Sequence, residues 1–377
     1  MALLDHRLAA SSSWWTLAPF ALGLLGCGGK GGNVRCDPSI DVCDSGATGG
    51  QGGSATSSTT GGGKGGSIGA GGAPVGDAGR TFQNKIVAYL PTWSGSLKAL
   101  AVDLPWLEVS QINVAFAYPA GSTLTLATPP AMPGTGADLY IADFVTAAHN
   151  KGAKVFVSLG GAGGSAAIAA QLVPASVDAF VTSVASYVDA QNLDGIDVDV
   201  EGNNVNVNYG PFVDKLVQKL RPKGKQVTAA LAQWFGNRVD NATYALFDSV
   251  NVMSYDHCNN NTPGTCATYD SAVSELTYFQ GKGLTTDKLL LGVPFYCHCW
   301  GPGCGGLAQI SYAQVNLKFP GGMDDIVSAG TTYSCNGPAT IQRKAELARD
   351  YAGMMAWEIT QDAGGDQSLL KVIAGHL

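Results

Sequence analysis

The sequence predicts an α/β protein whose residues 81–377 form one (β/α)8 barrel, a TIM barrel. These residues exceed the roughly 250 that such a barrel usually needs. Along them, short apolar runs alternate with helical stretches, which is typical of parallel strands covered by helices. One of the runs carries acids at every second position, so one strand of the barrel is expected to present a row of carboxylates.

Residues 1–26 have the pattern of a secretory signal peptide. An apolar run that ends at Leu25 follows Arg7, and it is too short to span a membrane. It continues into Gly26-Cys27, which is similar to a bacterial lipobox, where the Cys is lipidated and becomes the mature N-terminus. We therefore expect an exported cell-surface lipoprotein that meets the membrane only through a lipid anchor at Cys27. The alternative is a secreted protein with an ordinary signal peptide and a free Cys27.

Residues 27–80 are mostly Gly, Ser, Thr and Ala, with almost no bulky apolar side chain. Such a segment cannot bury enough surface to offset the entropy lost on ordering, so we predict a disordered Gly/Ser-rich linker. Cys36 and Cys43 lie inside it and are expected to close a small disulfide loop. The predicted domain boundaries are therefore 1–26, 27–80 and 81–377.

Eight short apolar runs after the linker are predicted to be the barrel strands. They are residues 85–90, 111–117, 154–159, 195–201, 227–232, 249–255, 288–294 and 353–357. In barrels of this kind, active sites form where the strands end at the C-terminal face. Four polar or aromatic residues lie at such ends and are candidates for a site: Glu201, Tyr255, Asp256 and Trp357.

The strand 195–201 carries Asp197, Asp199 and Glu201, with an aliphatic residue between each pair. On a strand the acids share one face, about 6.6 Å apart, while the aliphatic face packs on helices. Burying three carboxylates is costly unless they share protons or find donors. An exposed acidic strand and a calcium loop of the EF-hand type are the alternatives. The flanking runs look like buried parallel strands, which argues against an exposed strand. The β-branched residues between the acids argue against a calcium loop.

Residues 193–201 resemble the active-site signature of glycoside hydrolase family 18, the chitinases and their relatives, which is Asp-Gly-x-Asp-x-Asp-x-Glu. The resemblance covers most of residues 83–362. Motifs near other strands also carry it: the aromatics Tyr89 and Trp93, Phe116, Ser158-x-Gly160-Gly161, Met253-x-Tyr255-Asp256, Gly292-x-Pro294-x-Tyr296 and Trp357-Glu358. The resemblance implies a barrel enzyme that hydrolyses glycosides.

The resemblance also implies a substrate-assisted mechanism with retained configuration. Glu201 would protonate the glycosidic oxygen, while the 2-acetamido carbonyl of the sugar attacks its own anomeric carbon. Asp199 would orient the acetamido N–H and raise the pKa of Glu201. Asp197 would share a proton with Asp199. Tyr255 would donate a hydrogen bond to the acetamido oxygen.

A set of substrate-binding residues is implied in the same way. Trp357 would form the apolar floor under the sugar ring, unless it is a core residue. Asp256 would bond the sugar or support Tyr255, unless it caps a helix. The other members of the set are Ser158, Gly161, Met253, Trp93 and Tyr89. For several aromatic residues the sequence does not decide between stacking on the sugar and packing within the protein, namely Trp93, Trp234, Tyr296 and Trp300. Two histidines are expected to be structural, namely His257 and His298.

The chain has nine cysteines: Cys27, Cys36, Cys43, Cys258, Cys266, Cys297, Cys299, Cys304 and Cys335. Without the lipid site an even number remains, which favours disulfides in an exported chain. Cys258 is expected to pair with Cys266, and the last four cysteines allow three connectivities, which stay open. The alternative is a metal site formed by Cys297, His298, Cys299 and Cys304. No other motif implies a metal, and none implies a cofactor.

The interval between the last two predicted strands, about 295–351, is short and rich in Cys and Gly. Many members of the resembled family carry a sizeable α+β insertion there, which walls a deep groove. We expect a disulfide-pinned loop in its place, and therefore a shallower and more open cleft that is compatible with endo action.

The expected function is retaining hydrolysis of β-1,4-linked N-acetylglucosamine glycosides, with chitin or chitooligosaccharides as substrate. The alternatives are an endo-β-N-acetylglucosaminidase that acts on N-glycans or peptidoglycan, and a non-catalytic chitin-binding surface lectin. Such lectins typically lose the terminal acid of the signature, so Glu201 argues against that function. The net charge of −7 and the lack of basic clusters argue against nucleic acid. We expect a monomer.

Overall fold

The computed structural model describes residues 84–126, 137–258, 261–321 and 324–377. The predicted signal peptide, the linker, Cys27 and the Cys36–Cys43 bridge lie outside these residues. Among the described residues, no helix combines the length and the apolar composition that a membrane span needs.

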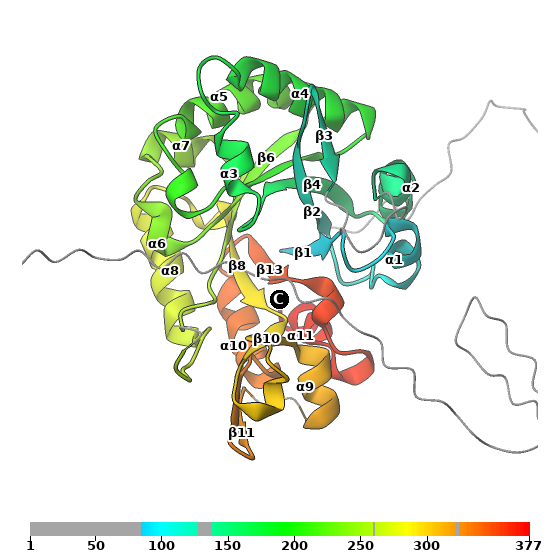
Figure 1. Ribbon diagram of the computed structural model, residues 1–377, viewed down its shortest axis with the longest axis vertical. Coiled ribbons are helices and arrows are strands. Elements are labelled where there is room, and N and C mark those ends of the chain that lie inside the picture. Colours follow the sequence, from blue (N-terminus) through cyan, green and yellow to red (C-terminus); the bar gives the residue numbers. More distant parts are fainter. Residues whose placement is uncertain (1–83, 127–136, 259–260, 322–323) are drawn as a thin grey trace, which may run out of the picture. The chain divides into compact units, whose positions relative to one another are not determined.

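Eight parallel strands close into a barrel, which confirms the predicted fold class (Figure 1). The order around it is β1, β13, β8, β7, β6, β5, β4 and β2, and pairing of β1 with β2 closes the ring. Their bounds are β1 Lys85–Pro91, β2 Gln111–Ala120, β4 Lys154–Gly160, β5 Gly195–Asp199, β6 Gln226–Leu231, β7 Ser249–Val252, β8 Leu289–Pro294 and β13 Gly353–Trp357. Strand β3 (Thr123–Leu126) pairs antiparallel with the end of β2.

Helices follow most of the strands and cover the outside of the barrel, as Figure 1 shows for α4, α5 and α7. The helices are α1 Leu97–Asp103, α2 Ala137–Asn150, α3 Ser165–Ala169, α4 Val177–Ala190, α5 Tyr209–Leu220, α6 Gln233–Gly236, α7 Asn241–Leu246, α8 Tyr269–Gly281, α10 Pro338–Ala348 and α11 Leu369–His376. Side-chain caps begin several of them. The Thr268 side chain, for example, accepts a hydrogen bond from the Ser271 amide at the start of α8.

Two predicted strands extend two or three residues beyond the C-terminal ends of the observed ones. β5 ends at Asp199, two residues before Glu201, and β7 ends at Val252, before Tyr255. Beyond β5 the chain leaves the ladder, because the Glu201 amide donates to the Ser165 hydroxyl and not to a neighbouring strand. Both functional candidates therefore lie just past the strand ends, on the face where barrel sites form.

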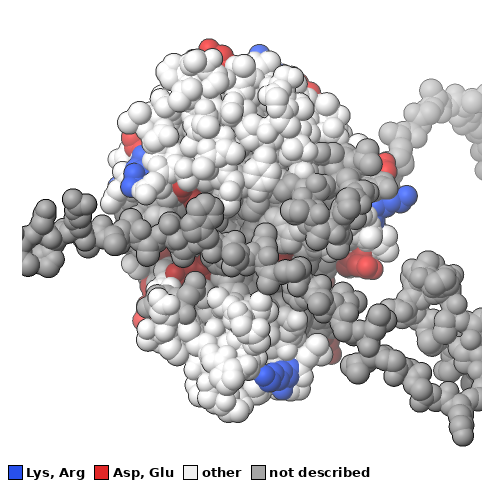
Figure 2. Space-filling view, viewed as in Figure 1, with Lys and Arg blue, Asp and Glu red and all other residues white. Residues whose placement is uncertain are grey.

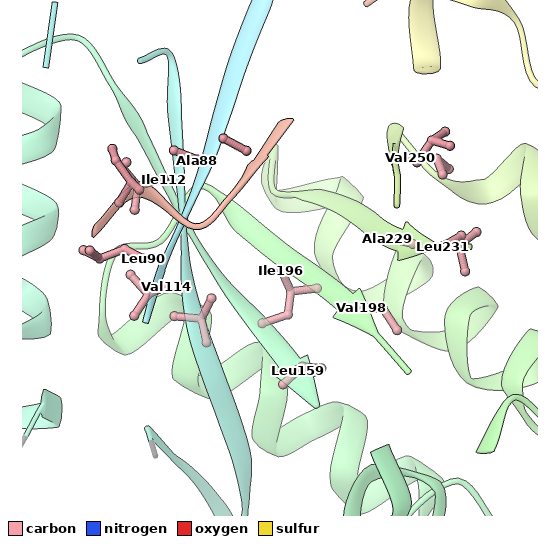
Figure 3. Packing of buried hydrophobic residues seen from close by; sticks show 14 of the residues in the cluster. Ala88, Leu90, Ile112, Val114, Leu159, Ile196, Val198, Ala229, Leu231 and Val250 are labelled. Atoms are coloured by element: carbon pink, nitrogen blue, oxygen red, sulfur yellow. The ribbon is translucent and has the colours of Figure 1, made fainter. Parts of the chain in front are cut away.

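The apolar core has two parts, which are separated by the wall of the barrel. The larger part lies between the strands and the helices, and it contains Ile196 and Val198 of β5 (Figure 3). A smaller cluster lies inside the barrel and includes Tyr89, Phe116 and Met355, with Trp357 packed against it. The alternation predicted for β5 is confirmed, since its aliphatic residues join the outer core and leave the opposite face to the acids.

The expectation of a loop between β8 and β13 is wrong. The chain forms a small four-stranded antiparallel sheet there, in the order β10-β9-β12-β11, together with one helix. The elements are β9 Tyr296–Trp300, β10 Gln309–Ser311, α9 Tyr312–Lys318, β11 Asp325–Ser328 and β12 Thr331–Ser334. We call this segment, 296–334, the insertion; its parts β10, α9 and β11 lie at the lower end of Figure 1. Antiparallel pairing lets such short strands satisfy their backbone groups within about 40 residues.

The face shown in Figure 2 is mostly uncharged where the described residues are visible. Its Lys and Arg side chains form small separate spots, and acidic side chains appear nearer the middle of the view. A phosphate backbone is bound by basic side chains that are clustered on one surface, and this face does not offer such a cluster.

Candidate active site

Asp197, on β5, is fully buried and is the best satisfied of the three acids. Its Oδ2 accepts hydrogen bonds from the hydroxyls of Tyr89 and Ser158, both at 2.7 Å. Its Oδ1 accepts from the Thr228 hydroxyl at 2.6 Å and from the Asn251 amide at 3.2 Å. Burial raises the pKa of Asp197, and these hydrogen bonds oppose that rise. Four donors converging on one carboxylate fit its ionised form.

We expect Asp197→Ala to lower the free energy of unfolding by about 3 kcal/mol, because it leaves several buried donors without an acceptor. Ser158→Ala is the matched control, since it removes one donor and should cost about 1 kcal/mol. Urea denaturation of the two variants and the wild type checks this. Equal, small losses in both variants would contradict the anchoring role of Asp197.

Asp199 is buried as well, but its environment differs from that of Asp197. Its Oδ1 has no hydrogen-bond partner among the described residues. Burial first, and then the negative charges of Glu201 and Asp197, raise the pKa of Asp199 well above its usual range. Burial and the neighbouring charges therefore favour the protonated form of Asp199, and its Oδ1 is available to a ligand.

Glu201 lies just past β5, and Ser165 holds its backbone. The Glu201 amide donates to the Ser165 hydroxyl at 2.9 Å, and that hydroxyl donates to the Gly161 carbonyl at 2.7 Å. The Gly161 amide donates to the Asp199 carbonyl at 2.8 Å. Gly161 has a φ of +71°, and a Cβ there would lie 2.4 Å from the Phe116 ring, so only glycine fits this turn. The glycine pair thus ties the end of β4 to the acidic strand.

Burial raises the pKa of Glu201 to about 7, and the negative charge of Asp256 contributes to the rise. We expected the charge of Asp199 to have this effect. The two acids do repel each other, and this repulsion appears as the charge of Glu201 raising the pKa of Asp199. A carboxyl group that is protonated near neutral pH is suited to donate a proton to a leaving group.

Tyr255 follows β7 and packs against the cluster inside the barrel. Burial and the surrounding acids, with Asp199 the foremost of them, raise its pKa well above the usual value. The phenol therefore keeps its proton and remains a donor at any physiological pH. Its ring meets that of Tyr296 edge to face, with centroids 6.4 Å apart.

Trp357 is part of a continuous aromatic surface at the end of β13. Its ring centroid is 5.5 Å from those of Tyr89 and Phe116, and 6.4 Å from that of Trp93. Trp357 is only partly buried, and Trp93 is 42% exposed, so the surface extends from the barrel interior toward solvent. Partly exposed aromatic rings of this kind suit the apolar face of a sugar.

Four other predicted binding residues support the site from behind or beside it. Tyr89 and Ser158 are buried and donate to Asp197, so they act on the acid. Gly161 forms the turn described above. Met253 is half-buried and packs against both parts of the core.

Asp256 has a φ of +63° and a side chain that is 49% exposed. Its Oδ1 accepts hydrogen bonds from the Tyr296 hydroxyl and from Nε2 of His298, the latter at 2.7 Å. The helix-cap alternative is wrong, because the N-cap of the following helix is Thr268. His257 contacts Glu275 at 3.0 Å, and both histidines therefore have ordinary polar partners.

Trp234 and Trp300 differ in their surroundings. Trp234 is 74% exposed, and a Cβ added to Gly202, the residue after Glu201, would lie 2.8 Å from its ring. Trp234 thus lies over the chain beside Glu201 and is accessible to a ligand. Trp300 stacks on His298, with centroids 5.8 Å apart, and belongs to the packing of the insertion.

The cysteine pattern resolves into three disulfides among the described residues. Cys258 pairs with Cys266, as predicted, and the open set pairs as Cys297–Cys335 and Cys299–Cys304. The metal-site alternative at Cys297, Cys299 and Cys304 is wrong, since all three sulfurs are consumed by these bridges.

Ser165 is the functional residue that sequence reasoning missed. A serine at the start of a short helix is common, and the signal that could have identified it is its place directly after the glycine-rich turn. His298 was noticed only as a structural residue, because its partner Asp256 is 42 residues away in sequence.

Comparisons with known proteins agree with this geometry. The family model for glycosyl hydrolases family 18 matches residues 85–362. A chitinase-like effector from Moniliophthora perniciosa is 29% identical over an alignment of 232 residues. The match covers 52% of this chain and 52% of the effector, so the chain spans about half the length of that relative.

Solved structures extend the comparison to the fold. The chitinase ChiB of Flavobacterium johnsoniae superposes with a TM-score of 0.67 at 25% identity, covering 78% of this chain and 93% of that one. A class V chitinase from Nicotiana tobaccum, solved in complex with NAG4, superposes with a TM-score of 0.65 at 18% identity, covering 78% and 98%. With the acidic row, the tyrosine and the aromatic floor at its strand ends, and with the family model matched along the whole barrel, this chain belongs to glycosyl hydrolase family 18.

Proposed function

We propose that the protein hydrolyses β-1,4-linked N-acetylglucosamine glycosides with retention of configuration, and that chitin or chitooligosaccharides are its substrates. The observation that supports this most is the pairing of two differently tuned acids. Glu201 has a pKa raised to about 7, and Asp199 has a pKa far above its usual range and an unpartnered oxygen. Acid catalysis needs a carboxyl group with a raised pKa such as that of Glu201. A polar substituent on the substrate would donate a hydrogen bond to the unpartnered oxygen of Asp199.

In the first step Glu201 donates its proton to the glycosidic oxygen as the bond to the anomeric carbon breaks. The acetamido carbonyl oxygen of the same sugar forms a bond to that carbon from the opposite face, which gives an oxazolinium ion. The proton that Asp199 shares with Asp197 passes to Asp197, so Asp199 accepts the acetamido N–H as a carboxylate and balances the positive charge. The Tyr255 phenol donates to the acetamido oxygen and holds it in line for attack.

In the second step the ionised Glu201 removes a proton from water, and the water oxygen attacks the anomeric carbon. The oxazolinium opens, and the acetamido group is restored. Two displacements at one carbon return the original configuration. Trp357 supports the ring from its apolar face throughout. The remaining acids do not serve as nucleophile in this scheme, because Asp197 and Asp256 are engaged by donors from the protein.

N-glycans and peptidoglycan contain the same 2-acetamido sugar and are the alternative substrates, since the acids alone do not distinguish the polymers. Product analysis on chitin oligomers, a high-mannose glycoprotein and peptidoglycan side by side would separate them. We expect N-acetylglucosamine oligomers to be cut fastest. Faster release of an N-glycan would replace chitin with the glycoprotein as the substrate.

A non-catalytic lectin is the second candidate, favoured by the similarity to a chitinase-like effector. The retained Glu201 with its raised pKa argues against it, because a binding site has no use for a buried proton donor. Binding of chitin oligomers without any reducing-end release would favour the lectin.

The pH dependence should follow Glu201. The acid must be protonated, so we expect kcat/KM to be lost as pH rises through about 7, the pKa that burial and Asp256 give Glu201. Initial rates on an N-acetylglucosamine oligomer from pH 4 to 9 check this. A basic limb near the ordinary carboxyl pKa of about 4.5 would contradict the tuning.

Export and membrane anchoring through Cys27 are also proposals. They are supported by the leader pattern and by the three bridges of the globular part, since stable disulfides form in oxidising compartments. Metabolic labelling with a palmitate analogue should mark Cys27. An unlabelled secreted product would favour an ordinary signal peptide. The boundaries 1–26, 27–80 and 81–377 and a monomeric state complete the proposal.

A further inference from the structure

The insertion reaches the site through Asp256. Both donors to this carboxylate come from β9, the first strand of the insertion, and both use the same oxygen, Oδ1. A carboxylate can only accept, so Nε2 of His298 carries the hydrogen of the 2.7 Å contact. Oδ1 is held by these two donors, and the Asp256 side chain is 49% exposed. Its other oxygen, Oδ2, can therefore accept a hydrogen bond from a hydroxyl of a ligand.

His298 is held firmly enough to position another group. Its side chain is only 6% exposed, and its ring stacks on Trp300. One ring nitrogen lies within 4.8 Å of the sulfurs of both Cys258 and Cys266, whose bridge closes the chain just after Asp256. The residues on either side of His298, Cys297 and Cys299, are both tied by disulfides. The imidazole therefore has little room to turn.

The position of the Asp256 carboxylate affects the pKa values of the groups around it. Its negative charge helps to raise the pKa of Glu201, and also those of Tyr255 and Tyr296. These three groups and His298 are the titratable side chains that face it, from the end of β5, the end of β7 and β9. A carboxylate that turned away would act on none of them.

We propose that His298 is a positioning residue, whose Nε2–H fixes the Asp256 carboxylate beside Glu201 with Oδ2 directed at a hydroxyl of the bound sugar. This inference rests on the proposed hydrolase function. It goes beyond that function because it gives the insertion, through one histidine, a part in both substrate binding and the state of the proton donor.

Three substitutions separate positioning from packing. His298→Leu removes the donor, His298→Gln places an amide N–H near the position of Nε2, and His298→Asn places it too far back. For His298→Leu we expect kcat/KM on an N-acetylglucosamine pentamer to fall about tenfold, which is the loss of one charge-assisted hydrogen bond. Its basic limb should also move to lower pH, because the charge beside Glu201 is no longer held. His298→Gln should restore most of the rate and the wild-type limb, and His298→Asn should not.

Asp256→Asn provides the reference for the pH effect, since it removes the charge itself and should move the basic limb in the same direction. In that background His298→Leu should have little further effect, because the group that it positions is no longer charged. Additive effects, a wild-type pH profile in His298→Leu, or equal impairment of His298→Gln and His298→Leu would each overturn the proposal. If His298→Leu fails to fold, the comparison of Gln with Asn decides the matter.

Binding distinguishes this proposal from the function on which it rests. In an inactive Glu201→Gln background, titration calorimetry with the pentamer should show that His298→Leu weakens affinity about tenfold, whereas His298→Gln does not. If the wild type cleaves none of the substrates but this loss of affinity is seen, the hydrolase proposal fails and the positioning role stands. Unchanged affinity and an unchanged pH profile would refute the positioning role alone.

Discussion

Glu201→Gln should lower kcat on N-acetylglucosamine oligomers by at least about a thousandfold, since a glutamine cannot donate a proton to the leaving group. Its affinity for the same oligomers should stay close to that of the wild type, because the amide keeps the shape of the side chain. The Ser165 contact should also remain, because it is made to the backbone of residue 201. Release of reducing ends and titration calorimetry measure the two effects separately.

The stability of Glu201→Gln supplies an internal control. The folded-state pKa of Glu201 is raised from 4.5 to about 7, so the stability that its protonated form contributes is lost as pH rises through about 7. A neutral glutamine does not suffer this loss. The variant should therefore be at least as stable as the wild type at pH 8, and lost activity cannot be attributed to unfolding. Full activity of the variant would remove Glu201 from the acid role.

An oligomer of glucosamine, which lacks the N-acetyl group, should be cleaved about 10⁵-fold more slowly than the acetylated oligomer. In the proposed mechanism the internal acetamido oxygen is the nucleophile, and a well-placed intramolecular nucleophile is worth an effective concentration of about 10⁵ M or more. The acids of this site do not replace it, because Asp197 is occupied by its donors and burial favours the protonated, non-nucleophilic form of Asp199.

The matched substrates for this comparison are an N-acetylglucosamine pentamer and the same pentamer after deacetylation, at equal concentration and at pH 6. Competition by the deacetylated pentamer shows whether it still binds. Cleavage of both at similar rates would refute the participation of the substrate and would require a protein nucleophile.

The barrel was predictable because its eight strands are short, apolar and buried on both faces. Each is therefore easy to distinguish in the sequence from the amphipathic helices between them. The acidic row was predictable for a related reason: alternation on β5 forces Asp197 and Asp199 to one face and Ile196 to the other. Glu201 and Tyr255 follow the ends of β5 and β7 by only two or three residues, so convergence of the strand ends brings both to the same face of the barrel.

The insertion was not predictable by the same reasoning. Its strands have three to five residues with mixed polarity, such as Gln309–Ser311, and short strands of this kind carry no clear period. The disulfide connectivity was undecided for a similar reason, because Cys297 and Cys299 lie two residues apart on one strand and each could reach several partners. Only the register of β9 against β12 places them.

Electrostatic detail also required coordinates. The sequence places Asp199 next to Glu201, but it gives no sign that the charge of Asp256, far along the chain, also contributes to the raised pKa of Glu201. The hydrogen bonds that oppose the rise in the pKa of Asp197 come from four different strands. Neither fact has a local sequence signal, since both depend on closure of the barrel.

The most direct measurement is proton NMR of the anomeric signals during hydrolysis of an N-acetylglucosamine pentamer. If Glu201 acts as acid and then as base around an oxazolinium formed by the substrate, the β anomer should appear first and the α anomer should follow only by mutarotation. Initial formation of the α anomer, or the absence of any new reducing end, would contradict the account.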